Sequence, residues 1–236
     1  MTATTSARAA GSVSRQHAGF DRRALAVLMP IGPLAIAIVR GILPYYTDDS
    51  NTTMARQVAA HQGAESLVVW LTFVAMLTVI PGVIAVGLLA RRGAPRLGTI
   101  GLVLTFAGFM SLFWSNVAGS DNVALGASRI GLSPILTGRL LDSMGAVPAI
   151  GLGSDLFVVG HILGLVLLGI ALWRGHVLPS WAALLIAVSQ ILHFIFAVIV
   201  PVHALDGLAW GLTAVGFAVA ALVLVREPDG DVSRVA

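Results

Sequence analysis

The stretch Gly153–Trp173, GSDLFVVGHILGLVLLGIALW, decides the fold, because it is a long apolar segment that still contains Asp155 and His161. Its length matches the ~20 residues that an α-helix needs to cross the hydrocarbon core of a bilayer. An ionisable side chain inside a bilayer is costly unless it is paired, so both residues mark a candidate functional site. The stretch therefore predicts a membrane-spanning helix that carries polar groups.

The composition of the whole chain also places it in a membrane. The 236 residues are 57% hydrophobic and only 11% charged, too few charges to cover a soluble globule of this size. All 14 basic residues are Arg, and they lie in short segments between apolar stretches, as topology signals do. We therefore expect contact with the lipid bilayer and none with nucleic acid. The chain has no Cys, which excludes disulfides, thiolate catalysis and iron–sulfur clusters within it.

Six apolar stretches are long enough to span the bilayer. They are about Ala24–Tyr45, Leu67–Ala90, Leu97–Val117, Gly153–Trp173, Trp181–Val200 and Gly207–Val225. Pro30 and Pro33 in the first stretch and Pro81 in the second lack a backbone donor, so we expect these two helices to bend or break. The predicted fold class is an all-α, polytopic membrane bundle of six transmembrane helices.

The polar segments complete the domain plan. We expect residues 1–23 to be a disordered cytoplasmic tail, residues 24–226 to form the transmembrane domain, and residues 227–236 to form a second tail. Two longer loops, Thr47–Ser66 and Ala118–Leu152, lie on the opposite side of the membrane.

Both loops are predicted to carry short interfacial helices. Ser50 or Asn51 can cap the first of these helices, which we place on the membrane surface. Ser133-Pro134 has the form of an N-cap followed by Pro at the first helical position. That second helix lies at the interface or folds over the bundle.

The distribution of Arg predicts the orientation. Ten Arg residues fall on the side of the two termini and four on the side of the long loops. The ten are Arg8, Arg15, Arg22, Arg23, Arg91, Arg92, Arg96, Arg174, Arg226 and Arg234, and the four are Arg40, Arg56, Arg129 and Arg139. By the positive-inside rule, we expect a plasma-membrane protein with both termini in the cytoplasm.

His161 and His193 are the centre of the candidate site. Each lies eight residues inward from the outer end of its span, roughly 12 Å deep, and the short turn between the two helices makes them antiparallel neighbours. The two rings are therefore expected to face each other. Four other polar groups of the outer half complete the predicted ligand-binding set, which is His161, His193, Gln190, Asp155, Arg40 and Asp206. Asp155 and His161 point about 120° apart on an ideal helix, so they need not serve one site.

Several functions fit this set. The leading interpretation is an outward-facing polar His/Asp pocket that binds a small molecule, as in a proton-coupled transporter. The alternatives are a haem enzyme with His161 and His193 as axial ligands, a metal enzyme that adds His203 or Asp206, and a non-catalytic scaffold in which the His residues only join helices. We expect no cofactor and no metal site. Catalytic residues are left unassigned, and the questions of enzyme activity and of a homo-oligomer are left open.

The layout also carries a resemblance. The six-span plan and stretches such as Gly175–Trp181, GHVLPSW, after a helix that ends in LGIALWR, resemble an uncharacterised family of bacterial, actinobacterial-type, six-span integral membrane proteins of unknown function. The resemblance covers most of the region between Ala24 and Arg226. It implies a multi-pass membrane fold and supplies no catalytic residues.

Overall fold

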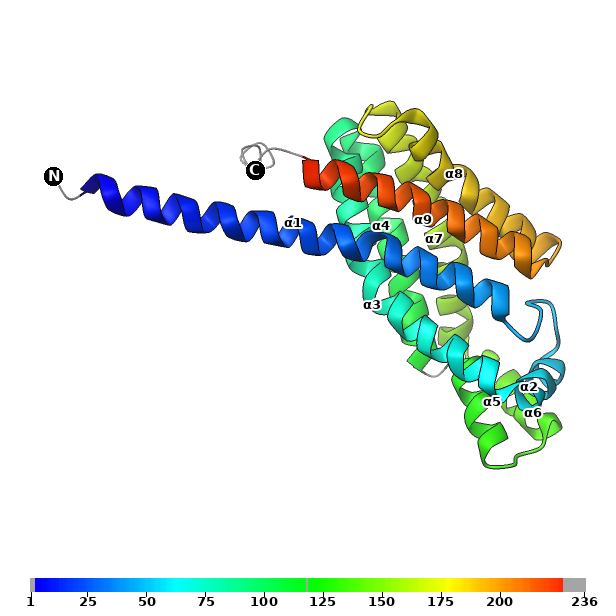
Figure 1. Cartoon of the computed structure of the whole chain (residues 1–236). Coiled ribbons are helices and arrows are strands. Elements are labelled where there is room, and N and C mark those ends of the chain that lie inside the picture. The colour runs from blue at the N-terminus through cyan, green and yellow to red at the C-terminus, as the bar shows by residue number, and fades with distance from the viewer. Residues whose placement is uncertain (1–2, 118, 227–236) are drawn as a thin grey trace.

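Helices make up nearly all of the chain in the computed structural model, which describes residues 3–117 and 119–226, with side chains described for 22–113 and 119–226 (Figure 1). In order, the helices are α1 Ala3–Ile42, α2 Asn51–Ala60, α3 Gln62–Gly93, α4 Pro95–Val117, α5 Ser120–Arg129, α6 Pro134–Gly145, α7 Pro148–Arg174, α8 Ser180–Phe194, the π-helix η1 Ile195–Ile199, and α9 His203–Arg226. No strand occurs within these described ranges. The expected C-terminal tail, residues 227–236, lies outside them.

Among the described residues, six helical segments are long and apolar enough to cross a membrane, which confirms the predicted all-α polytopic fold. They are Arg22–Ile42, Gln62–Gly93, Pro95–Phe113, Pro148–Arg174, Ser180–Ile199 and His203–Arg226. Three of the spans begin four or five residues earlier than the apolar stretches do, at Gln62, Pro148 and His203. The polar residues Gln62 and Glu65 therefore belong to a spanning helix and not to the loop before it.

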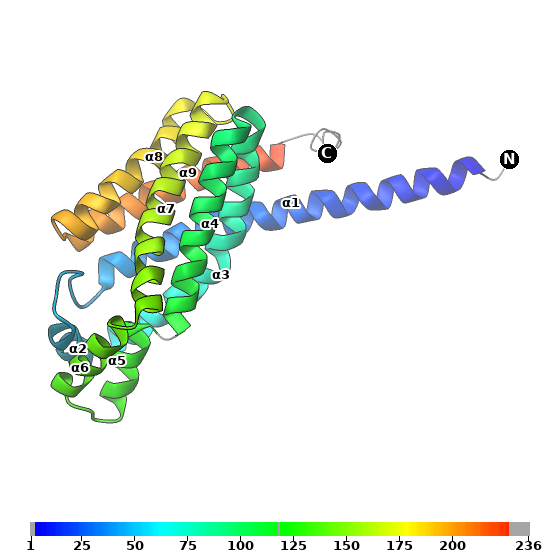
Figure 2. The same cartoon turned by 180° about the vertical axis from the view of Figure 1, so that it is seen from behind.

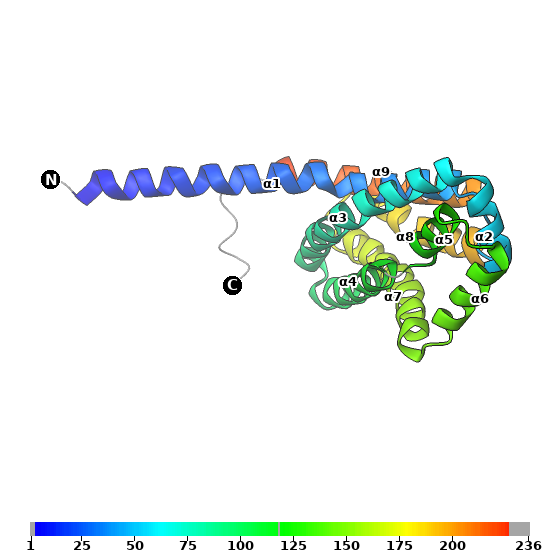
Figure 3. The same ribbon diagram turned by 90° about the horizontal axis from the view of Figure 1, so that it is seen from below.

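The first helix begins well before the first apolar stretch. The sequence predicts a disordered segment before Ala24, whereas α1 begins at Ala3 and is 40 residues long. Figures 1 and 3 show this first half of α1 extending away from the other helices. The disorder of the tail and its side of the membrane stay predictions.

The prolines of α1 and α3 do not break these helices. Pro30 and Pro33 lie inside α1 and Pro81 lies inside α3. The glycines next to these prolines lie where α1 and α3 are in close contact. A Cβ on Gly32 would lie 2.7 Å from the Cα of Val79 on α3, and a Cβ on Gly82 would lie 3.2 Å from the carbonyl oxygen of Met29. The Pro-Gly segments are therefore where the two helices pack backbone against backbone.

The six spans form a closed ring. Each packs against the next in the order α1, α3, α4, α7, α8, α9 and back to α1 (Figures 1 and 2). Large buried side chains fill the centre of this ring, among them Met29, Leu165, Leu168, Trp210 and Phe217. Large exposed apolar side chains, such as Trp70 and Val103, cover the outside, as expected for helices in lipid.

The long loops form a cap of their own at one end of the ring, and we call α2, α5 and α6 together the cap. Figures 1 and 2 show the three short helices gathered beyond the end of α3. Met54, Val58, Leu125 and Leu141 are buried between them in a small separate core. The loops thus carry short helices as predicted, and these helices pack on one another.

The predicted helix starts in the cap are confirmed. The hydroxyl of Ser50 accepts a hydrogen bond from the backbone nitrogen of Thr53 at 3.2 Å, and the hydroxyl of Ser133 accepts one from Leu136 at 3.3 Å. The opposite end of the ring, where α3, α7 and α9 finish in Arg residues, we call the arginine end.

Candidate functional site

Asp206 is the centre of the candidate site. It lies in the first turn of α9, where the positive end of the helix dipole favours a carboxylate, and it is fully buried. Arg40 of α1 donates from Nε to one carboxylate oxygen, and Nδ1 of His193 on α8 lies 2.5 Å from the other oxygen. One carboxylate therefore joins three spanning helices close to the cap end of the ring.

His193 Nδ1 has a second polar neighbour. The indole nitrogen of Trp210 lies 3.1 Å from it and can only donate a hydrogen bond. When Nδ1 carries a proton, it donates to Asp206; when it carries none, it can accept from Trp210. The location of one proton therefore selects which of the two bonds His193 makes.

His161 lies beside His193, as the sequence predicts. The centroids of the two rings are 5.4 Å apart, and the His161 ring also stacks on Phe157 at 4.2 Å and on Trp210 at 5.9 Å. Nδ1 of His161 lies 2.5 Å from the carbonyl oxygen of Phe157, whereas its buried Nε2 has no hydrogen-bond partner. We call Arg40, His161, His193, Asp206 and Trp210 the Asp206 cluster.

The position of His161 depends on close packing of α7 against α4. A Cβ on Gly108 would lie 2.5 Å from the backbone nitrogen of His161, and a Cβ on Gly160 would lie 2.8 Å from the carbonyl oxygen of Leu104. Small residues therefore let α4 press the His161 turn of α7 toward the centre of the ring.

The remaining predicted site residues lie apart from this cluster. Gln190 is fully buried one turn before His193, and its amide nitrogen donates to Thr213 of α9 at 2.9 Å. Its role in the structure is a second link between α8 and α9, supported by Ser189, whose hydroxyl lies 2.7 Å from that of Thr213. Asp155 is exposed on α7 and makes no contact with the cluster. The geometry thus joins His161, His193, Arg40 and Asp206 and leaves Asp155 out.

A haem does not fit between the two His rings. The rings are tilted by 49° to each other, and Trp210 packs against both of them. The three rings occupy the space that the macrocycle would need between two axial ligands. A catalytic metal needs about three protein ligands, and among the described residues no three His, Asp or Glu side chains are arranged to hold one. His203 instead stacks on Tyr46, with ring centroids 4.2 Å apart.

A second group of polar residues lies nearer the cap, and the sequence did not predict it. We call its members, Tyr45, Glu65 and Asp121, the acidic cluster. The hydroxyl of Tyr45 donates to a carboxylate oxygen of Asp121 on α5. Burial raises the pKa of Asp121 above its ordinary value, although the hydrogen bond from Tyr45 and the charge of Arg40 oppose this rise. Burial and the charge of Asp121 raise the pKa of Tyr45, so the phenol stays neutral.

Glu65 is the third member of the acidic cluster. Its side chain is 0% exposed, and neither of its carboxylate oxygens has a hydrogen-bond partner. Its charge interacts with that of Asp121. A buried carboxylate without a partner is costly, so it marks a place where a ligand or a proton is needed.

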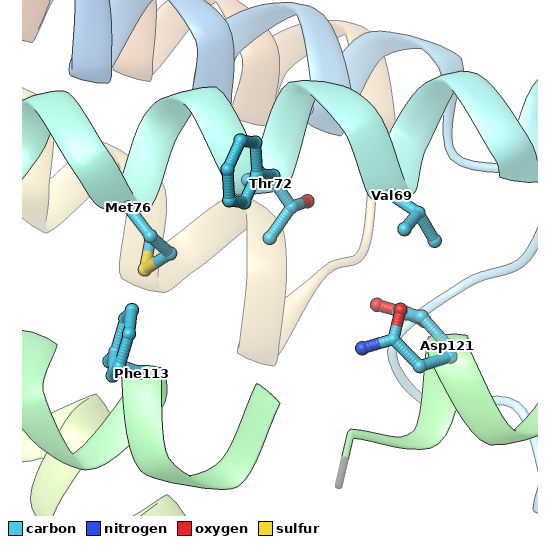
Figure 4. Close-up of a pocket in the computed structure, with 7 residues that line it drawn as sticks. Val69, Thr72, Met76, Phe113 and Asp121 are labelled. Atoms are coloured by element: carbon cyan, nitrogen blue, oxygen red, sulfur yellow. The ribbon is translucent and has the colours of Figure 1, made fainter. Parts of the chain in front are cut away.

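A pocket of about 300 Å³ lies beside the acidic cluster, between α3, α4 and α5 (Figure 4). We call it the α3–α4–α5 pocket. Val69, Thr72, Phe73, Met76 and Phe113 line most of it, and Asp121 and Asn122 close one end. A small molecule can enter this pocket, whereas the Asp206 cluster is packed between helices. None of the six predicted ligand-binding residues lines the pocket.

Comparisons with known proteins add no relatives to this description. No family model matches the chain, and no curated protein and no solved structure gave a match.

Proposed function

We propose that this chain is a proton-coupled binder or transporter of a small molecule, and that the Asp206 cluster is its proton-binding site. The observation that carries the proposal is the position of His193 Nδ1, between an acceptor at 2.5 Å and a donor at 3.1 Å. A group with two such partners changes its bonds when one proton arrives or leaves.

The same proton affects more than one helix. Asp206 of α9 is bound by Arg40 of α1 and by His193 of α8, so protonation of the pair alters how three neighbouring helices are held together. A proton-coupled transporter needs such a link between a proton site and the relative position of its helices. The π-helical turn η1 directly after α8 supports the proposal further, because π-turns are frequent at functional sites.

We also propose the finer parts of the topology. The excess of Arg at the arginine end supports cytoplasmic termini in the plasma membrane, with the cap and the Asp206 cluster toward the outside. Kinship with the actinobacterial-type six-span family stays a prediction. The haem and metal alternatives lose support because the ring geometry and the ligand arrangement do not fit them.

The test is a pH-dependent distance between two helices of the cluster. Because the chain has no Cys, Ile42→Cys at the end of α1 and Ala204→Cys at the start of α9 can be spin-labelled selectively. In lipid nanodiscs, we expect the measured distance distribution to shift between about pH 5 and 8, the range in which His usually titrates.

Two variants decide the origin of that shift. His193→Asn places an amide nitrogen near the position of Nδ1 and removes the imidazole, so the shift should disappear. His176→Asn, at an exposed position in the turn after α7, is the matched control and should keep it. If the distance distribution of the spin-labelled parent is the same at about pH 5 and 8, the cluster only holds the helices together. That result would favour the scaffold alternative.

A further inference from the structure

The α3–α4–α5 pocket has an apolar body that opens toward lipid. Phe73 and Phe113 line it, and they are 54% and 45% exposed on the outer surface of the ring. Met76 is buried at its inner wall. In Figure 4, Met76 and Phe113 approach each other from α3 and α4 at one end of the pocket. An apolar group can therefore enter this space sideways from the bilayer.

The other end of the pocket is acidic. Figure 4 shows Asp121 on the side of the pocket opposite Phe113, below Val69. Glu65 lies one turn before Val69 on the same face of α3, since residues i and i+4 of a helix share a face. Both of its carboxylate oxygens are buried without a hydrogen-bond partner, and its charge interacts with that of Asp121. Asp121 thus lies at the polar end of an apolar space, and Glu65, which does not line the pocket itself, is close enough for its charge to act on Asp121.

Acidic side chains outnumber permanent cations around this region. The Asp206 cluster and the acidic cluster together contain three carboxylates, Glu65, Asp121 and Asp206, and one permanent cation, Arg40. Arg40 donates its Nε hydrogen bond to Asp206. An added positive charge next to Asp121 and Glu65 would offset the cost of burying them.

We propose that the α3–α4–α5 pocket binds an amphipathic amine, with its ammonium group against Asp121, where the nearby charge of Glu65 adds to the attraction, and its apolar body between Phe73, Met76 and Phe113. The volume of about 300 Å³ is at the lower end of the range for small-molecule sites and suits a short alkyl or aryl amine. The same chemistry is offered by a free alkylamine and by the ammonium head group of an aminophospholipid. This proposal does not rest on the proton role of the Asp206 cluster.

Binding at this site should depend on pH in a defined direction. Burial raises the pKa of Asp121, so part of the population holds a proton there at a pH where an exposed carboxyl is ionised. The charged groups that face Asp121 are Arg40 of α1 and Glu65 of α3, and Tyr45 donates its hydroxyl hydrogen bond to it. An ammonium ion favours the ionised carboxyl, so binding releases a proton and the affinity rises as pH rises through the raised pKa.

The experiment measures binding of radiolabelled octylamine to the full chain in phosphatidylcholine nanodiscs by equilibrium dialysis, with empty nanodiscs subtracted. 1-Octanol and octanoate have the same chain length with a neutral and an anionic head. We expect saturable binding of octylammonium, at least about tenfold weaker binding of the other two probes, and higher affinity at pH 8 than at pH 5. Equal binding of all three probes would show partition into lipid and would overturn the proposal.

Variants locate the site. Asp121→Asn keeps an acceptor for Tyr45 and removes the charge, so it should weaken octylammonium binding by at least about tenfold. Asp48→Asn, at an exposed position in the loop after α1, is the matched control and should bind like the parent. Thr72→Trp fills the pocket and leaves every carboxylate in place, so it should also abolish binding. Parent-like binding by either Asp121→Asn or Thr72→Trp would overturn the proposal, and the second variant decides the matter if the first one unfolds.

A final arm separates the two sources of the amine. Nanodiscs that contain phosphatidylethanolamine should compete with octylammonium if the natural occupant is an aminophospholipid. Undiminished binding in these nanodiscs assigns the site to a free amine. Either result is compatible with a failure of the pH-dependent distance test, so the two proposals can fail separately.

Discussion

At the scale of single residues, Asp206 links α1, α8 and α9 through two oxygen atoms. We expect Asp206→Asn to lower the free energy of unfolding by about 3 kcal/mol, because it leaves the guanidinium of Arg40 in a mostly buried position without its counter-ion. Thermal unfolding of the purified protein in detergent measures this change.

The matched control is Asp155→Asn, the same chemical change at an exposed position of α7. It should alter the unfolding free energy by less than about 0.5 kcal/mol. Similar losses in the two variants would mean that the ion pair does not stabilise the bundle and that Asp206 is held by packing alone.

The sequence predicted half of this polar structure. An ionisable residue inside an apolar stretch stands out, so His161, His193, Arg40 and Asp206 could be found before their contacts were known. Glu65 and Asp121 could not, because acidic residues are ordinary in a polar loop. Their burial comes from the way α5 packs against the first turns of α3, which is a property of the tertiary fold.

At the scale of helices, the glycines of α7 set its distance from α4. A Cβ on Gly164 would lie 2.5 Å from the backbone nitrogen of Thr105 and 2.9 Å from the carbonyl oxygen of Gly101. We expect Gly164→Ala to destabilise the bundle by about 1–3 kcal/mol, because backbone atoms of α4 would have to move. Unfolding in detergent, followed by circular dichroism, measures the loss.

Gly211→Ala is the internal reference for this change. No heavy atom outside its own helix lies within 4 Å of the position of a Cβ there, so the substitution should be neutral or should stabilise α9 by up to about 1 kcal/mol through better helix propensity. If Gly164→Ala is also neutral, the two helices adjust to each other more easily than their contact distances indicate.

The spacing of small residues predicted only some of the close contacts between helices. Small residues at i and i+4 occur at Gly160 and Gly164, where they do meet α4, and also at Gly207 and Gly211, where only the first one meets another helix. The sequence spacing is the same in both pairs. The neighbour that each glycine meets depends on the rotation of its helix in the ring, which spacing alone does not determine.

At the scale of the whole molecule, the arginine end and the cap end lie on opposite sides of the ring. In intact cells, we expect an impermeant thiol reagent to label Ser143→Cys, which lies in the cap, and to leave Ser180→Cys, at the arginine end, unlabelled. Both positions are exposed, and the parent offers no Cys background.

Permeabilised cells provide the accessibility control, since both variants should then be labelled. Labelling of Ser180→Cys and not Ser143→Cys in intact cells would reverse the orientation and would turn the Asp206 cluster toward the cytoplasm.

The number of spans could be predicted from the length of the apolar stretches, and the contact between α7 and α8 could be predicted from the short turn that joins them. The ring order could not, because it depends on which helix faces pair.

The cap has a consequence for the order in which this protein is made. Its core joins Met54 and Val58 of α2 to Leu125 of α5 and Leu141 of α6, and two complete spanning helices, α3 and α4, separate these parts along the chain. In the proposed orientation, α2 is translocated as the chain leaves the ribosome, and its apolar face stays uncovered until both of those spans have been inserted. During that interval it is a natural target for a chaperone or a protease on the far side of the membrane.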